Sequence, residues 1–184
     1  MQREEALSLL KSKIQNVNLI KHSLAVEAVM VALANHFNQD SEKWSLAGLL
    51  HDIDYEKTKD NPLEHSAVGA KMLEELGVDK EISQAVKVHN EAHGILPETL
   101  MEKALYAVDP LTGLIVAATL VLPSKKIADL TVENVINRFG EKSFARGANR
   151  EIMKKCEELL GLSLEKFVQI GLGAMQNIAV NLEL

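Results

Sequence analysis

The sequence predicts an all-α protein that forms a single compact helical bundle, and three observations support this. Runs that alternate apolar and polar residues, the pattern of a half-buried strand, are nearly absent. Apolar residues instead recur at helical spacing in segments separated by short polar or Gly-containing stretches. The 184 residues, 47% of them hydrophobic, suffice for one core and are too few for two comfortable ones. We therefore expect one domain over residues 1–184.

Three helices are expected in the first third of the chain. Apolar residues recur at helical spacing over residues 3–14 and 18–37, and a third helix covers residues 44–53. Ser41 stands before this third helix, where its hydroxyl can cap the first free N–H groups. The residues at 56–61 are polar, and we expect a loop there.

Two further helices are expected before residue 90. Asn61 as the N-cap and Pro62 as the first helical residue begin one of them, and Gly77 ends it. Asp79 caps the other, which runs to about His89.

The second half of the chain is also expected to be helical. A loop at 90–97 precedes helices over residues 98–108, 110–122, 131–139, 149–160 and 163–182. The residues that carry candidate chemistry lie within about 18–122, so the helices of residues 123–184 are additions to that core.

Composition and charge exclude several classes of partner. The net charge is −6 and the isoelectric point is near 5.5, which argues against a duplex nucleic acid partner. The apolar run at 111–122 ends before Pro123 and is too short to span a bilayer, and the charged N-terminus has no apolar signal core. Cys156 is the one cysteine, so no intrachain disulfide can form. We expect a cytoplasmic protein with no membrane partner; the oligomeric state stays open.

The placement of histidines is the most informative feature of the sequence. On separate expected helices, His22, His51, His65 and His89 take positions that a core residue would normally occupy, and Asp52 directly follows His51. Burying a polar group without a partner costs about 1–3 kcal/mol. A shared metal ion would satisfy several of these groups at once, because imidazole and carboxylate suit Zn, Fe or Mn.

Each residue alone also has a structural explanation. His22 fits a hydrogen-bonded core histidine, His65 a surface residue of a first helical turn, and His89 a helix end where positive charge is favoured. His93 fits a solvated loop residue, and Asp109 an N-cap for the helix that follows. The whole set, and no single member, indicates a metal site.

The ordered set resembles the pattern of the HD-domain superfamily of metal-dependent phosphohydrolases. That pattern is a His, then an adjacent His-Asp pair, then a distal Asp, with two further histidines between the pair and the distal Asp in many members. The matching residues here are His22 in IKHSLAVEAV, His51 and Asp52 in LAGLLHDIDYEK, His65 in EHSAVGAKML, His89 in AVKVHNEAHG and Asp109 in LYAVDPLTG. The layout is similar to that of the bacterial dinucleoside tetraphosphate hydrolases of this superfamily.

The resemblance implies a ligand set for one or two divalent transition-metal ions: Fe, Mn, Zn, Co or Ni. One ion would take His22, His51, Asp52 and Asp109, and a second would take His65 and His89. Asp52, with two carboxylate oxygens, would bridge the ions and is the catalytic residue. Several relatives carry a Gly-Lys soon after the His-Asp pair; here Lys57 is displaced from that place and is the candidate for binding substrate phosphate.

The function implied is hydrolysis of a phosphate ester or anhydride by a metal-activated water, with a nucleotide or another small phosphorylated molecule as the substrate. Two alternatives remain: a di-iron oxygenase of the same superfamily, and a non-catalytic module that binds metal or nucleotide. Gly48 and Gly69 lie one helical turn from Asp52 and His65, and we expect them to let helices approach closely around the site.

Overall fold

The computed structural model describes residues 1–184 and is all-α, as predicted, with no strand. The α-helices are α1 (Arg3–Lys13), α2 (Val17–His36), α3 (Ser41–Leu50), α4 (Tyr55–Thr58), α5 (Ala67–Glu75), α6 (Lys80–Val88), α7 (Leu100–Leu120), α8 (Val132–Gly140), α9 (Arg150–Lys154), α10 (Cys156–Leu160), α11 (Leu164–Asn177) and α12 (Ala179–Leu182). Two short 3-10 helices, η1 (Glu91–His93) and η2 (Ile127–Asp129), lie in the connections.

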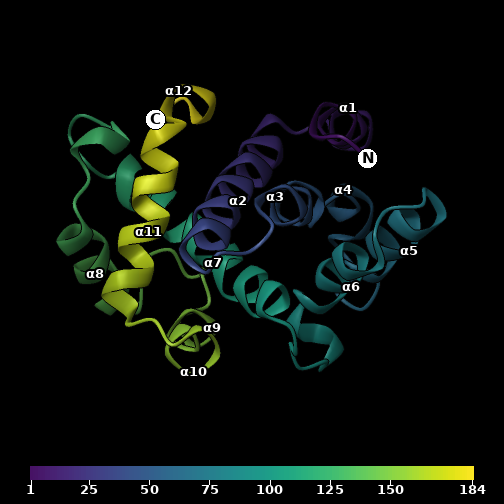
Figure 1. Ribbon diagram of the computed structural model, residues 1–184. Coiled ribbons are helices and arrows are strands. Elements are labelled where there is room, and N and C mark those ends of the chain that lie inside the picture. The colour runs from purple at the N-terminus through teal and green to yellow at the C-terminus, as the bar shows by residue number, and fades with distance from the viewer.

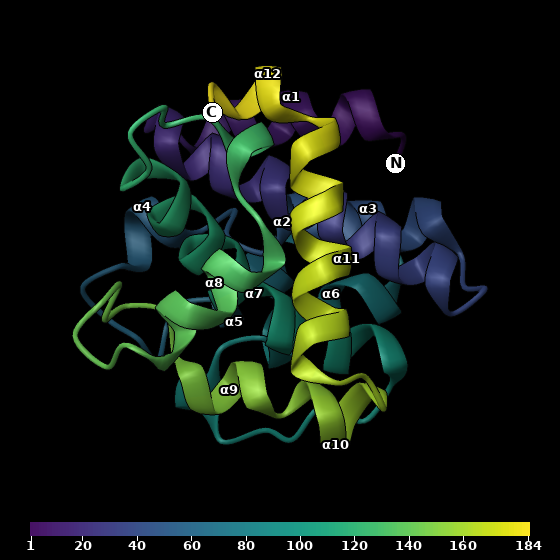
Figure 2. The same cartoon turned by 90° about the vertical axis from the view of Figure 1, so that its left-hand side faces the viewer.

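The long helices α2 and α7 lie at the centre of the molecule (Figure 1). Helices α1 and α3 to α6 gather on one side of them, and α8 to α11 gather on the other. Helix α11 packs on α2, α7 and α8 and runs along the outside of the bundle (Figure 2). An apolar cluster of 43 buried residues draws on both halves of the chain, so α2 and α7 hold the site residues against a continuous core.

Several helix starts follow the capping chemistry of the sequence, and the start of α3 needs a correction of one residue. Asp79 caps α6 as predicted, by accepting a hydrogen bond from the backbone N–H of Glu81 at 2.9 Å. The predicted cap Ser41 is the first residue of α3 instead. Asp40 is the cap, because its carboxylate accepts from two backbone N–H groups and satisfies more of the free donors than a hydroxyl can.

The helix predicted to begin at Pro62 begins five residues later. Residues 62–66 form turns, and Ser66 has a φ of +67°, which is incompatible with a continuous right-handed helix. The Ser66 hydroxyl donates to the carbonyl of Lys87 at 2.9 Å, so a contact with α6 holds this turn. His65 therefore sits ahead of α5 and not on its apolar stripe.

The break predicted between residues 108 and 110 is absent, because α7 continues through Pro110. A proline inside a helix removes one backbone hydrogen bond, here the one to the carbonyl of Tyr106. Residues on both sides of the proline, among them Val108 and Leu111, are fully buried, and their packing outweighs this loss.

Other predicted boundaries differ by short interruptions. The predicted loop at 56–61 contains the single turn α4, and the loop at 90–97 contains η1. The helix predicted at 149–160 is split into α9 and α10, and the helix predicted at 163–182 is split into α11 and α12.

By length and composition, α2 and α7 could each cross a membrane, a test that core helices also pass. In α7, 61% of the apolar window is buried within the fold, and in α2 the share is 44%.

Candidate metal centre

The carboxylate of Asp52 lies between two pairs of histidines. Its Oδ2 atom is 3.6 Å from Nε2 of His22 and 3.4 Å from Nε2 of His51. Its Oδ1 atom is 3.3 Å from Nε2 of His65 and 3.5 Å from Nε2 of His89. Each carboxylate oxygen therefore faces one pair of imidazoles, and Asp52 is common to two groups of potential metal ligands.

Asp109 joins the first of these groups from α7. Its Oδ1 atom is 3.0 Å from Nε2 of His22 and 3.8 Å from Nε2 of His51. His22 comes from α2, and His51 and Asp52 come directly after α3, so three separate parts of the chain supply this group. The structure thus brings all six predicted ligand residues into one cluster.

The outer nitrogen of each imidazole has its own partner. Nδ1 of His51 donates to the carbonyl of Gly48 at 2.8 Å, and Nδ1 of His89 donates to the carbonyl of Val86. Nδ1 of His65 donates to Oδ1 of Asp54 at 3.1 Å.

Nδ1 of His22 donates to the hydroxyl of Thr112 at 3.1 Å, and that hydroxyl donates onward to the carbonyl of Asp109. All four rings thus carry a proton on Nδ1, as their partners require, and direct Nε2 at the cluster. Partners of this kind are typical of metal-binding histidines, whose orientation and basicity they set.

The donor set fits a metal ion. Nε2 of His89 is buried and has no hydrogen-bond partner, and Nε2 of His22 and Nε2 of His51 face each other at 3.2 Å. Two ligands about 2.1 Å from an ion lie about 3.0–3.4 Å apart at right or tetrahedral angles. The spacing of the donor atoms here is close to that of such a ligand shell, and a cation would give Nε2 of His89 the partner that it lacks.

The charges of the cluster also favour a bound cation. Burial disfavours the charged form of His51, but the Asp52 and Asp109 carboxylates outweigh burial and raise the pKa of His51 to about 9. Burial likewise opposes ionisation of Asp52, yet His51, His89 and His22 hold its pKa well below the usual range. The buried Asp52 carboxylate therefore requires positive charge beside it, from protons or from a metal ion.

The position of His65 depends on residues outside the ligand set. Nε2 of His93 donates to the carbonyl of His65 at 2.8 Å and lies 3.0 Å from the hydroxyl of Ser66. The Asn90 amide donates to the same carbonyl at 3.0 Å. His93 was expected to be a solvated loop residue; it is half-buried and holds the turn that aims His65 at Asp52.

Asp54 is a second residue whose role was not predicted. Its side chain is buried, with 1% exposure. Its Oδ1 atom accepts from His65, and its Oδ2 atom accepts from the backbone N–H of Gly69 at 2.7 Å. A Cβ at Gly69 would lie 3.2 Å from Cγ of Asp54, so the glycine allows this close approach.

Gly48 lets α2 and α3 meet closely, as predicted. A Cβ at Gly48 would lie 2.8 Å from Cα of Glu27 on α2, a distance that real contacts do not show. Since the next turn of the chain carries His51 and Asp52, this contact sets the depth at which they enter the bundle.

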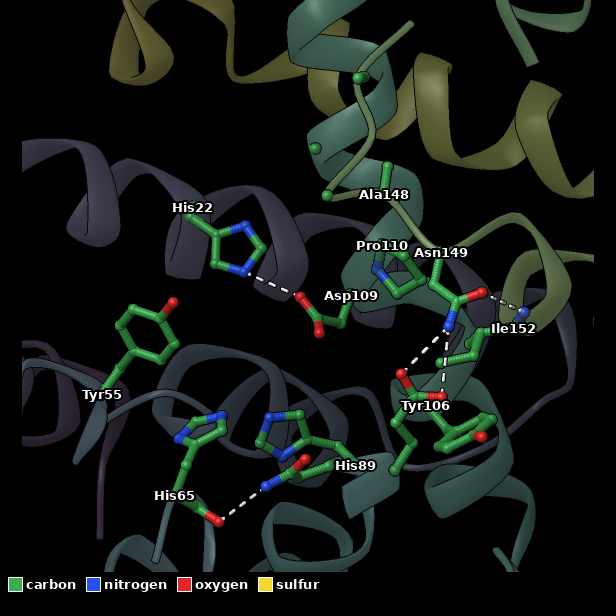
Figure 3. A pocket seen from close by; sticks show the side chains of 15 residues that line it. His22, Tyr55, His65, His89, Tyr106, Asp109, Pro110, Ala148, Asn149 and Ile152 are labelled. Atoms are coloured by element: carbon green, nitrogen blue, oxygen red, sulfur yellow. Dashed lines mark hydrogen bonds and ion pairs between the residues drawn. The ribbon is translucent and has the colours of Figure 1, made fainter. Parts of the chain in front are cut away.

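A cleft of about 480 Å³ opens above the cluster (Figure 3). His22, His65, His89 and Asp109 lie on its floor, with Tyr55 at one end and Tyr106 with Asn149 at the other (Figure 3). No lysine or arginine is among the lining residues. An anionic substrate in this cleft therefore meets no fixed cation on the walls.

Lys57, the predicted phosphate ligand, does not line this cleft and is exposed on α4. Tyr55, two residues earlier, lines the cleft, and side chains two apart on a helix point in different directions. Glu56, between them, accepts hydrogen bonds from the backbone N–H groups of Gln15 and Asn16 at the start of α2.

One wall of the cleft comes from the loop between α8 and α9, which the sequence did not connect with the site. Ala145, Gly147, Ala148 and Asn149 of this loop line the cleft. The guanidinium of Arg150 donates to the carbonyls of Ala145 and Ala148 at 2.6 and 2.8 Å and also to that of Phe144, and so fixes the shape of the loop.

Comparison with known proteins gives the following matches. A family model described as HD domain matches residues 19–139. An uncharacterised protein of Methanocaldococcus jannaschii is 36% identical over 166 residues, which cover 88% of each chain. A symmetrical bis(5'-nucleosyl)-tetraphosphatase of Bacillus subtilis is 31% identical over 130 residues, 59% of this chain and 68% of that protein.

A ribonuclease Y of Lawsonia intracellularis is 32% identical over 140 residues, 73% of this chain. The matched region spans only 26% of the length of that ribonuclease. No solved structure gives a significant match.

Proposed function

Because the chain belongs to the HD-domain family of metal-dependent phosphohydrolases, we propose that it hydrolyses a phosphate ester or anhydride of a nucleotide or other small phosphorylated molecule. One observation carries the proposal: four histidines present Nε2 to the two oxygens of Asp52, and each has its Nδ1 fixed by a partner. In this proposal His22, His51, Asp52 and Asp109 hold one divalent ion, and Asp52, His65 and His89 hold a second.

A divalent ion held there would lower the pKa of a coordinated water and neutralise charge on the phosphoryl oxygens. The lining of the cleft supports this role for an ion, because no lysine or arginine on its walls could offset the charge of a phosphate. In the hydrolysis, the hydroxyl of water adds to phosphorus, the bond from phosphorus to the leaving oxygen breaks, and that oxygen takes up a proton.

Residues of the chain orient the ligand histidines and the substrate. Thr112 and the carbonyl of Gly48 keep His22 and His51 in the Nδ1–H form, so neither ring can turn its lone pair away from the cluster. Tyr55 and the loop residue Asn149 stand at opposite ends of the cleft, where they would contact the substrate on either side of the phosphate.

Two of the relatives have names that state an activity, and these activities suggest different substrates. One is called a ribonuclease, and the other a symmetrical bis(5'-nucleosyl)-tetraphosphatase. Since the tetraphosphatase match extends over most of that protein, nucleotides and dinucleoside polyphosphates are the first substrates to test.

The test combines metal analysis of the purified protein with a hydrolysis screen of nucleotides, dinucleoside polyphosphates and short oligoribonucleotides. We expect divalent transition metal in the wild type and release of phosphate or nucleotide. The Asp52→Ala variant should remain folded, lose metal and lose turnover, whereas a Glu42→Ala control on the exposed start of α3 should keep both. Full turnover by Asp52→Ala at saturating metal would refute the proposal.

Two other results would favour the alternative functions. Oxygen consumption with a mixed-valent iron signal would indicate a di-iron oxygenase. Tight binding of metal and nucleotide without turnover of any phosphorylated compound would indicate a regulatory binding module.

A further inference from the structure

A second hollow adjoins the cleft at His22. It has a volume of about 470 Å³, and we call it the α2/α7 groove. Its lining residues come from α2, α7 and the segment after α11: Asn18, Lys21, His22, Gly113, Val116, Ala117, Leu120, Leu182, Glu183 and Leu184. His22 and Gly113 line both the groove and the cleft, so the two hollows adjoin at the candidate metal centre.

Gly113 is one of the two residues that line both hollows. It is exposed in the middle of α7, although its neighbours Thr112 and Leu114 are buried. A glycine inside a helix costs about 1 kcal/mol relative to alanine. At Gly48 close packing explains such a glycine, but a Cβ at Gly113 would have no atom within 4 Å. Packing therefore does not require Gly113, and its effect is to keep the surface between the cleft and the groove free of a side chain.

The chemistry of the groove differs from that of the cleft. Its wall is apolar along α7, from Val116 to Leu120, and Leu182 and Leu184 face it from the C-terminal segment. Polar groups lie at its edge, where the Lys21 ammonium pairs with the Glu183 carboxylate at 2.6 Å. Apolar walls with a polar edge suit a flat group such as a nucleobase, which has apolar faces and hydrogen-bonding edges.

We propose that the α2/α7 groove is a second substrate subsite, and that the substrate crosses Gly113 from the metal centre into it. This inference rests on the proposed hydrolase function and narrows its substrate class. The substrate would carry groups on both sides of the scissile phosphate, as a phosphodiester or a substituted phosphoanhydride does. One arm lies in the cleft, and a nucleoside-sized arm lies in the groove.

Two substitutions test the proposal by blocking the groove at different points. Gly113→Leu places a side chain on the crossing, and Ala117→Phe fills the groove without touching the cleft. The matched control is Gly173→Leu, at a glycine of α11 that also has open space at Cβ and lines neither hollow. Metal content and the melting temperature are measured for each variant, so that damage to the centre is separated from a blocked subsite.

The substrates fall into two groups. Diadenosine tetraphosphate and the dinucleotide ApA have arms on both sides of the phosphate, whereas AMP and 4-nitrophenyl phosphate have one. We expect the wild type to favour the two-armed group in kcat/KM by at least about tenfold, which corresponds to about 1.4 kcal/mol. Gly113→Leu and Ala117→Phe should remove this preference with unchanged metal content, and Gly173→Leu should keep it.

The possible failures are distinct. A wild type that favours one-armed substrates, or a preference that survives in both groove variants, would overturn the subsite while leaving the hydrolase function in place. If Gly113→Leu loses metal, Ala117→Phe alone tests the subsite. A preference for two-armed substrates that survives in Ala117→Phe would then overturn the subsite, and its loss would support it. A fully metal-loaded wild type that hydrolyses no substrate in either group would overturn the hydrolase function, and the subsite with it.

Discussion

Nε2 of His93 lies 2.8 Å from the carbonyl oxygen of His65, so a side chain outside the ligand cluster fixes the backbone of a residue inside it. The turn that it holds includes Ser66, whose positive φ is unfavourable for a residue other than glycine. The strained turn and the hydrogen bond together point the His65 ring at Oδ1 of Asp52.

We expect His93→Ala to weaken binding of the second metal ion by about tenfold, the range seen when outer partners of ligands are removed. Binding of the first ion, at His22 and His51, should change little. Titration of the metal-free protein with Mn²⁺, followed by calorimetry, measures both sites. His93→Gln, which keeps an N–H donor, should restore part of the affinity.

His36→Ala is the matched control for His93, because the His36 ring is exposed at the end of α2 and contacts Phe37 edge to face, away from the candidate metal centre. Equal effects of the two substitutions on the second ion would contradict a positioning role for His93.

The close contact of Gly48 with α2 predicts a sharp effect on stability. In Gly48→Ala the added methyl would lie 2.8 Å from Cα of Glu27, and backbone atoms cannot rotate away. We expect the free energy of unfolding to fall by about 1–3 kcal/mol. Gly173→Ala, with open space at Cβ, should instead gain up to about 1 kcal/mol from helix propensity. Urea denaturation of both variants checks the prediction, and equal changes would contradict it.

Local chemistry explains which parts of the fold could be predicted. Asp79, Thr131, Asn149 and Ser163 each cap the helix that was predicted to begin there, because a cap needs only a side-chain acceptor and the next few N–H groups. The continuity of α7 through Pro110 could not be predicted in the same way, since it depends on packing against helices distant in the sequence.

Local patterns also decide which residues of the site could be identified from the sequence. His22, His51, Asp52, His65, His89 and Asp109 were identifiable because they are polar residues at apolar positions or follow an ordered motif. Thr112 and Asp54, which orient His22 and His65, could not be identified, because each pairing joins residues 90 or 11 positions apart and no local pattern marks it. The loop at 145–149 could not be connected with the cleft, because its neighbours there come from helices far away in the sequence.

The metal-free protein should lose stability as the pH rises above neutrality. The pKa of His51 is raised from 6.5 to about 9 in the folded protein, despite burial, by Asp52 and Asp109. A raised pKa stabilises the fold fully below pH 6.5, and this contribution is lost as the pH rises through about 9. It amounts to about 3 kcal/mol.

We therefore expect the melting temperature of the protein in EDTA to fall between pH 6.5 and pH 9.5. The metal-loaded protein should show a smaller fall, because a cation replaces the proton beside Asp52. A melting temperature of the metal-free protein that stays constant or rises over this range would contradict the raised pKa of His51.

The number of ions bound is open to a direct test at His65 and His89. Both rings face Oδ1 of Asp52, and the other pair faces Oδ2, so the two pairs can be disturbed separately. If each pair holds one ion, His65→Ala and His89→Ala should each reduce the metal content from about two per chain toward one. Elemental analysis of dialysed protein measures this ratio.

The kinetic constants of the same two variants separate a substrate-binding role of these histidines from a purely structural one. If a single ion is bound and these histidines contact the phosphate of the substrate, KM should rise while metal content stays at the wild-type value. If they only support the fold, the melting temperature should fall with normal kinetics. The His89→Ala variant is the more informative of the two, because Nε2 of His89 is buried without a hydrogen-bond partner and an ion would supply one. Unchanged metal content in both variants would exclude the second ion.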